Sequence, residues 1–264
     1  MKNLFSLKNK IIVITGGSGN LGKDFAKTLL EFEAKVAIFD LTDNNENENE
    51  NIKYFNVDIT NKDQIIKNLN KVKSIWGIPS GLINNAGIDS PPDSNSNSNT
   101  NIAFEKYSDS DWNKVMDVNL KGAFYCSQVI GYEMAKNMNG SIININSIYG
   151  NLSPDQRLYS HISNNEKRFY KPFVYGASKA GLSNLTKYLA TYWAKENIRI
   201  NTMTLGGVYN NQDAQFVRKY EYKVPMGRMA NTEDFRGGLI YLLSDSSRYV
   251  TGTDLIIDGG FSAW

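Results

Sequence analysis

The sequence predicts an α/β fold: a single Rossmann-type domain with a doubly wound parallel sheet of about seven strands and helices on both faces. Three observations predict it. A short, continuous apolar run at 11–14 suits a strand that is covered on both faces. A glycine-rich stretch follows at once, and apolar residues then recur at helical spacing up to Leu30. This strand and helix alternation continues along the chain, so the strands should be parallel with right-handed crossovers.

The expected strands are 10–15, 35–40, 52–57, 81–84, 141–146, 198–204 and 254–257, and the expected helices are 20–32, 61–74, 109–137, 174–196 and 232–244. Asp63, Asp109 and Asn231 stand near helix starts, where short polar side chains can satisfy free N–H groups. Ligands of such folds bind at the carboxyl ends of the strands, where the strand order reverses.

The glycine-rich turn from Gly16 to Gly22 is typical of a dinucleotide site. Its glycines permit a tight turn and a close backbone approach to a pyrophosphate, which binds at the helix N-terminus. Taken alone, the stretch could be any strand-to-helix turn. Its place at the start of an alternating α/β pattern favours the nucleotide.

Asp40 ends the second expected strand, roughly 20 residues past the glycines, where a carboxylate can accept hydrogen bonds from the adenosine ribose hydroxyls. It would also repel a 2′-phosphate, and no Arg occurs between Gly16 and Asn61. The predicted cofactor is therefore NAD(H) rather than NADP(H). The alternative is that Asp40 only caps the following turn.

Tyr175 and Lys179 lie one helical turn apart in the stretch FVYGASKAGL, and residues at this spacing share a helix face. A neighbouring cation stabilises phenolate, so Lys179 is expected to lower the pKa of Tyr175 and make it a proton donor or acceptor. The alternative is an exposed Tyr and a solvated Lys on an ordinary amphipathic helix.

With these anchors placed, nearly the whole chain resembles a classical short-chain dehydrogenase/reductase. The matching pieces occur in the family's order: TGGSGNLG, NVDIT, LINNAG, VMDVNLKG, IININSIYG, YGASK, a GGV turn and VTGTDLIIDGG. The resemblance implies nicotinamide-dependent hydride transfer between an alcohol and a carbonyl compound.

The resemblance also assigns roles to residues. Tyr175 is the acid/base, Lys179 lowers its pKa and holds the nicotinamide ribose, Ser147 binds the reacting oxygen, and Asn119 supports a water linked to Lys179. The expected cofactor-binding residues are Gly16, Ser18, Gly19, Asn20, Leu21, Gly22, Asp40, Asp58, Ile59, Asn85, Ala86, Gly87, Tyr175, Lys179, Gly206 and Val208. Structural alternatives are a helix kink at Asn119, a strand-end cap at Ser147 and a helix N-cap at Asp58.

The chain departs from the classical pattern at the first and last cofactor segments. Gly16, Gly19 and Gly22 are evenly spaced, closer to the family's extended subgroup, and Asn20 stands where classical members have Gly. Leu205 replaces the usual Pro and Asn210 a usual Thr. These changes concern one pyrophosphate or carboxamide contact and not the reaction class.

Composition narrows the remaining possibilities. The 264 residues suit one domain, and 41% hydrophobic residues can form a sizeable core. A net charge of +2 indicates no nucleic-acid partner. Cys126 is the only cysteine and is expected to be a small buried residue, while the single His161 cannot form a metal site. With no signal peptide or membrane-length apolar run, the protein is expected to be cytoplasmic.

Three segments stand apart from the core pattern. Two low-complexity stretches, 43–51 and 89–101, are predicted to be solvated surface loops. The third, 148–174, separates Ser147 from Tyr175 by more than the usual dozen or so positions and is predicted to be an insert over the substrate pocket. Its Tyr149, Arg157 and Arg168 are the candidate substrate-binding residues.

These basic and aromatic residues suggest a polar, anionic substrate such as a nucleotide-activated sugar. Some bacterial family members with a similar insert and a similar FSAW ending act in surface-glycan sugar pathways. The alternative is that the insert packs against a neighbouring subunit.

The family commonly forms dimers and tetramers through the helix that carries Tyr175 and the last strand, so a homotetramer or homodimer is expected. Aromatic and apolar side chains at Leu185, Tyr188, Leu189, Tyr192, Trp193, Phe261 and Trp264 suit an interface, although core packing would use them too. Two other functions stay open: epimerisation or dehydration with recycled NAD, and NAD binding by a regulator without catalysis.

Overall fold

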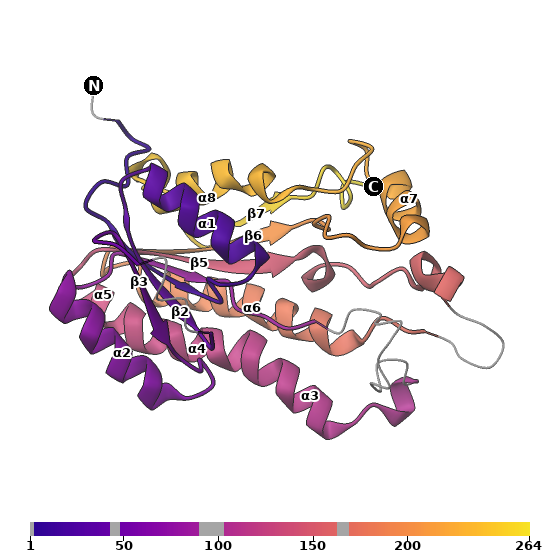
Figure 1. Ribbon diagram of the computed structural model, residues 1–264, viewed down its shortest axis with the longest axis horizontal. Helices are drawn as coiled ribbons and strands as arrows, with labels where there is room; N and C mark the ends of the chain where they lie inside the picture. The colour runs from indigo at the N-terminus through magenta and orange to yellow at the C-terminus, as the bar shows by residue number, and fades with distance from the viewer. Residues whose placement is uncertain (1–2, 43–47, 90–102, 163–168) are drawn as a thin grey trace.

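The computed structural model describes residues 3–42, 48–89, 103–162 and 169–264. One seven-stranded parallel sheet with the order β3-β2-β1-β4-β5-β6-β7 forms its centre (Figure 1). The strands are β1 Ile11–Thr15, β2 Lys35–Asp40, β3 Ile52–Asn56, β4 Gly81–Asn84, β5 Gly140–Ser147, β6 Ile198–Leu205 and β7 Asp254–Ile257. The predicted doubly wound fold is confirmed, and the strand bounds differ from those expected by one residue at most.

The helices are α1 Asn20–Glu31, α2 Lys62–Ile75, α3 Asp109–Met116, α4 Ala123–Cys126, α5 Tyr132–Lys136, α6 Phe173–Tyr192, α7 Ala214–Lys223 and α8 Arg236–Leu243. The helix expected at 109–137 contains two wide π-type turns, Asp117–Gly122 and Ser127–Gly131, between α3, α4 and α5. The α7 helix was not predicted. None of the helices in the described part of the chain is both long and apolar enough to cross a bilayer.

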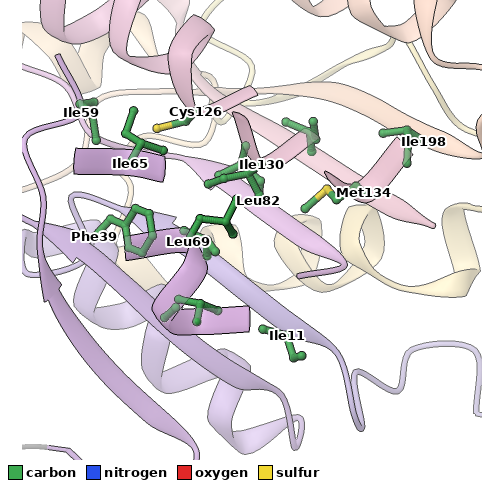
Figure 2. Packing of buried hydrophobic residues seen from close by; sticks show 14 of the residues in the cluster. Ile11, Phe39, Ile59, Ile65, Leu69, Leu82, Cys126, Ile130, Met134 and Ile198 are labelled. Carbon is green, nitrogen blue, oxygen red and sulfur yellow. The ribbon is translucent and has the colours of Figure 1, made fainter. Parts of the chain in front are cut away.

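Helices cover both faces of the sheet, as Figure 1 shows. On one face, Phe25 and Leu29 of α1 and Leu239 of α8 pack on the strands. On the other face, α2, α4, α5 and α6 build a second cluster, part of which is drawn in Figure 2. Cys126 lies in that cluster with no exposure, and burial raises the pKa of its thiol to about 12, so it is the inert buried residue expected.

Two of the expected helix caps were wrong by one or two positions. Asn61 caps α2, where its side chain accepts hydrogen bonds from the N–H groups of Asp63 and Gln64. Ser108 caps α3, and Asp63 and Asp109 lie within the first turns. The uncharged residue one or two positions earlier has the extended backbone that capping requires. Asn231 does form a capping box, with Asp234.

The described residues of the insert pack on α7 and form a third, smaller core. Its buried members are Ile148, Leu158, Tyr159, Phe169, Tyr220, Val224, Met229 and Phe261. Asp155 joins the insert to α7, because its carboxylate pairs with Arg157 in the insert and with Lys223 at the end of α7. Of the low-complexity stretches, 43–47 and 90–101 lie outside the described residues. Residues 49–51 are exposed, as expected.

Candidate active site

A cavity of about 1060 Å³ opens at the carboxyl ends of the strands. Ser147, Tyr175 and Lys179 line it, together with Leu21 of α1 and Gly87 after β4. The strand order reverses between β1 and β4, so the cavity lies where a doubly wound sheet binds its ligand.

Ser147 and Tyr175 meet although the insert separates them in sequence. Both side chains line the same cavity, and the neighbouring Ser147 hydroxyl lowers the pKa of the Tyr175 phenol. Two glycines allow the close approach of α6 to the end of β5: a Cβ on Gly176 would lie 2.7 Å from the Tyr149 carbonyl oxygen, and one on Gly150 would lie 3.1 Å from the backbone of Lys179. Ser147 also accepts a hydrogen bond from the N–H of Tyr149, so it is both a strand-end cap and a cavity residue.

The expected effect of Lys179 on Tyr175 was wrong for this structure. Burial raises the pKa of Tyr175 above its ordinary value, the charge of Asp89 raises it further, and the Ser147 hydrogen bond lowers it. Lys179 is itself deeply buried, and burial lowers its pKa to about 8. Its Nζ donates to the Ile145 carbonyl oxygen at 2.8 Å and lies 5.7 Å from the centre of the Tyr175 ring.

Asn119 lies in the first π-type turn, and its side-chain amide forms three hydrogen bonds with other residues of the protein. Its Oδ1 accepts from the Ile88 N–H at 2.8 Å, and its Nδ2 donates to the Ile88 carbonyl and to Ser178 Oγ. The π-type turn at this position fits the helix kink that was the structural alternative for Asn119, and the hydrogen bonds add a second role. They hold the loop after β4 against α6, with Gly87 next to both Asn119 Oδ1 and Lys179 Nζ.

The glycine turn has the geometry that a pyrophosphate needs. Gly16 has φ +64°, and a Cβ on Gly22 would lie only 2.3 Å from the Gly16 carbonyl oxygen. Within the part of the chain that the structure describes, no side chain caps α1 at Gly19, and the first turn of α1 holds no acidic residue, so the N–H groups there can meet an anion. Asn85 braces the turn, because its Nδ2 donates to the carbonyls of Thr15 and Gly16.

Asp40 is hydrogen-bonded to the turn itself. One carboxylate oxygen accepts from the Ser18 N–H at 2.9 Å, and the other accepts from Thr42. A carboxylate has about four acceptor sites, so capacity remains for a ribose diol. The Ser18 hydroxyl is buried and has no hydrogen-bond partner within the described residues, which also fits a nucleotide held here.

Asp58 does not cap α2, because Asn61 does; its Oδ1 instead accepts from the N–H and hydroxyl of Thr60. Ile59 is buried and packs against Gly122, because a Cβ added to Gly122 would lie 2.5 Å from the Cδ1 atom of Ile59. Asp58 follows β3, Asp40 ends β2, and Gly16 follows β1. These three strands are parallel neighbours in the sheet. The candidate residues for adenosine, pyrophosphate and nicotinamide therefore lie next to one another at the carboxyl ends of the strands.

The segment after β6 closes the other side of the cavity, and Gly206, Val208 and Asn210 all line it. The close approach of Asp258 requires Gly206, since a Cβ there would lie 2.8 Å from the Asp258 Cα. Val208 forms a single bridge with Ala230, and the Tyr220 hydroxyl accepts the Gly207 N–H. Leu205, in place of Pro, completes its pairing with Ile257 of β7.

The insert supplies different residues from those expected. Tyr149 lines the cavity, as predicted. The Arg157 side chain is 88% exposed and pairs with Asp155, so it does not reach the cavity. Arg168 lies outside the described residues.

Two ion pairs lie in the cavity wall: Lys171, one of the basic residues of the insert, pairs with Asp89, and His161 pairs with Asp213. The basic composition of the insert pointed to Lys171 as well as to Arg157, and only the folded chain shows that Lys171 is the one that lines the cavity. No group of His, Cys, Asp and Glu side chains in the described chain is arranged to hold a metal ion.

A Rossmann-type fold with an open nucleotide-binding edge and a Ser–Tyr–Lys cavity defines a class of nicotinamide-dependent oxidoreductases. A family model described as enoyl-(acyl carrier protein) reductase matches residues 17–262. A sorbose reductase of Schizosaccharomyces pombe is 30% identical over 275 residues, which cover 99% of both chains. The chain belongs to the short-chain dehydrogenase/reductase family, as its motifs predicted.

Two further relatives carry different nicotinamide cofactors. An NADP-dependent mannitol dehydrogenase of Hypocrea jecorina is 28% identical over 277 residues, covering 98% of this chain and 95% of that protein. The crystal structure of a short-chain dehydrogenase from Leptospira borgpetersenii with bound NAD+ is 35% identical, with a TM-score of 0.87, and the match covers 99% and 96% of the two chains. Sequence similarity to these two proteins does not by itself assign NAD or NADP as the cofactor of this chain.

Proposed function

We propose that this protein is an NAD-dependent dehydrogenase or reductase that interconverts a secondary alcohol and a ketone on a neutral polyol or sugar. The observation that carries the proposal is the convergence of Ser147, Tyr175 and Lys179 on one cavity, with Lys179 one helical turn from Tyr175. The relatives act on sorbose and mannitol by name, which supports a polyhydroxylated substrate. A screen of polyols, ketoses, nucleotide sugars and simple alcohols, followed by the absorbance of reduced nicotinamide, tests the proposal.

A nicotinamide cofactor, when bound along the strand ends, would supply the hydride for reduction or accept it in oxidation. Tyr175 gives its phenolic proton to the oxygen of a ketone, or takes the proton of an alcohol. Ser147 donates a hydrogen bond to the same oxygen, where negative charge develops. Lys179, held by the Ile145 carbonyl, binds the ribose next to the nicotinamide, and Asn119 holds the loop that forms the wall beside it.

Three alternatives are separated from this proposal by the structure or by the screen. Binding of the phosphates of a nucleotide sugar was expected from Arg157 and Arg168. Arg157 does not line the cavity, and Arg168 lies outside the described residues. Epimerisation or dehydration would recycle the nicotinamide, so net formation or consumption of NADH in the screen separates those reactions from simple oxidation or reduction. A regulator without catalysis would bind NADH but turn over no substrate.

Exchanging Asp40 for Asn should shift the cofactor preference toward NADP(H) by about tenfold, because a carboxylate at this position repels a 2′-phosphate. Asn keeps an oxygen that can accept the Ser18 N–H, so the turn should stay intact. The measurement is kcat/KM with each cofactor, and Asp63→Asn, at the start of α2, is the charge-matched control. Equal use of both cofactors by the wild-type enzyme would contradict the assignment of NAD.

The pH profile should differ between the two directions. The raised pKa of Tyr175 keeps its phenol protonated at neutral pH, while oxidation needs the phenolate. We therefore expect kcat/KM for oxidation to rise about tenfold per pH unit between about pH 6 and pH 8. Lys179, with a pKa of about 8, keeps most of its proton up to about pH 7 and is half deprotonated at about pH 8, so the tenfold slope is expected in the lower part of this range. Reduction uses the phenol and should not rise, and a flat oxidation profile would argue against Tyr175 as the base.

We also propose that the protein self-associates through α6 and its neighbours. Tyr188 and Tyr192 stack on each other on the surface of α6, where they are 61% and 62% exposed. Trp193 and Phe261 were expected at the interface, but both are buried within the protomer. Changing both tyrosines to Lys should reduce the particle mass measured by light scattering. Tyr249→Lys, at a fully exposed tyrosine, is the control, and an unchanged mass in the double variant would exclude this surface.

A further inference from the structure

Lys171 and Asp89 form an ion pair inside the cavity. Lys171 precedes α6 at the end of the insert, and its side chain is only 5% exposed. Asp89 belongs to the loop after β4, and its side chain is 36% exposed. Both residues line the same cavity as Ser147 and Tyr175.

The pair lies beside the phenol that carries the proton. Lys171 Nζ is 5.6 Å from the centre of the Tyr175 ring, nearly the same distance as Lys179 Nζ at 5.7 Å. The two ammonium groups have different partners, because Lys179 donates to a backbone carbonyl and Lys171 to a carboxylate. A substrate whose reacting oxygen meets Tyr175 would therefore share the cavity with the Lys171–Asp89 pair.

The chemistry of the pair fits a hydroxyl group. An ammonium group only donates hydrogen bonds and a carboxylate only accepts them, whereas a hydroxyl does both. A buried Lys alone would favour an anionic ligand, but Asp89 offsets its charge. The other acidic and imidazole groups in the cavity wall, Asp213 and His161, are also paired with each other, at 2.8 Å.

We propose that Asp89 and Lys171 bind the hydroxyl on the carbon next to the reacting carbon, and so make the enzyme selective for hydroxyketones and vicinal diols. This inference rests on the proposed oxidoreductase function. The competing explanation is that the pair only fastens the loop after β4 to the insert. In that case its loss would affect every substrate by the same factor.

The test compares acetoin with butanone, two ketones of the same carbon chain that differ by one hydroxyl, in NADH-dependent reduction. The wild-type enzyme should prefer acetoin in kcat/KM. Lys171→Met and Asp89→Asn should each lower the ratio of the two kcat/KM values by about 10- to 100-fold, the range expected for one hydrogen bond to a charged group. The ratio cancels any effect on Tyr175 that both ketones share.

Arg157→Gln removes a charge from the exposed side of the same insert and should leave the ratio unchanged. Should a single variant fail to fold because its partner's charge is left buried, the double variant Asp89→Asn/Lys171→Met removes both charges and should show the same fall. No preference for acetoin in the wild type, or equal losses with both ketones, would overturn the inference. Failure of the wild type with every ketone and ketose would instead contradict the proposed function.

Discussion

Replacing Tyr175 with Phe should lower turnover by about 100- to 10,000-fold, the contribution typical of a positioned acid or base. Phe keeps the ring, whose centre lies 5.6 Å from Lys171 Nζ and 5.7 Å from Lys179 Nζ, but lacks the hydroxyl. The proton would then have to come from water. The fold and the NADH affinity should change little, because most of the candidate cofactor-binding residues lie at the carboxyl ends of the strands and do not depend on this hydroxyl.

Steady-state kinetics and titration of NADH fluorescence measure the two effects separately. Tyr222→Phe, at a tyrosine that is 90% exposed on α7, removes the same atom elsewhere and should be neutral. Turnover near the wild-type value in Tyr175→Phe would remove Tyr175 from the chemistry and refute the proposed mechanism.

A single methyl group at Gly22 should nearly abolish cofactor binding. The added Cβ would lie 2.3 Å from the Gly16 carbonyl oxygen and 2.6 Å from the Gly17 Cα. Both are backbone atoms, so the turn itself has to move, and Asn85 ties that turn to the end of β4. The N–H groups at the start of α1 would then no longer converge on the pyrophosphate. We expect Gly22→Ala to raise the Kd for NADH at least about tenfold, consistent with loss of more than one hydrogen bond to a charged group.

Gly237 provides a matched control because it also lies in a helix, α8, and among the described residues no atom outside its own helical turn and chain neighbours lies within 4 Å of its added Cβ. Gly237→Ala should keep NADH affinity and stabilise the protein by up to about 1 kcal/mol, the helix preference of Ala over Gly. Isothermal titration gives the Kd and thermal unfolding gives the stability. Normal NADH affinity in Gly22→Ala would show that the turn is not the pyrophosphate site.

Much of the fold was predictable because its signals are local. Apolar runs such as Ile11–Thr15 are buried on both faces, and each is short enough to be told from a helix. The α7 helix was missed because only Tyr220 among its residues is buried. Its apolar side meets the insert, more than fifty residues earlier in the chain, and no local pattern reports such a contact.

The candidate site was predictable to a different degree in each part. The motifs placed Ser147, Tyr175 and Lys179 together, and the structure brings them to one cavity. The substrate side was less accessible to sequence. Arg157 and Lys171 are both cations of one insert, but one points outward to Asp155 and the other lies buried beside Tyr175.

The sequence by itself determined the order of strands and helices, the glycine turn and the identity of the residues at the strand ends, because spacing along the chain sets these features. Tertiary structure alone decided the protonation of Tyr175 and Lys179, since burial, and not their spacing on the helix, shifts their pKa values. It also decided which charges of the insert line the cavity. That choice depends on contacts with α7 and with the loop after β4, which only the folded chain brings together.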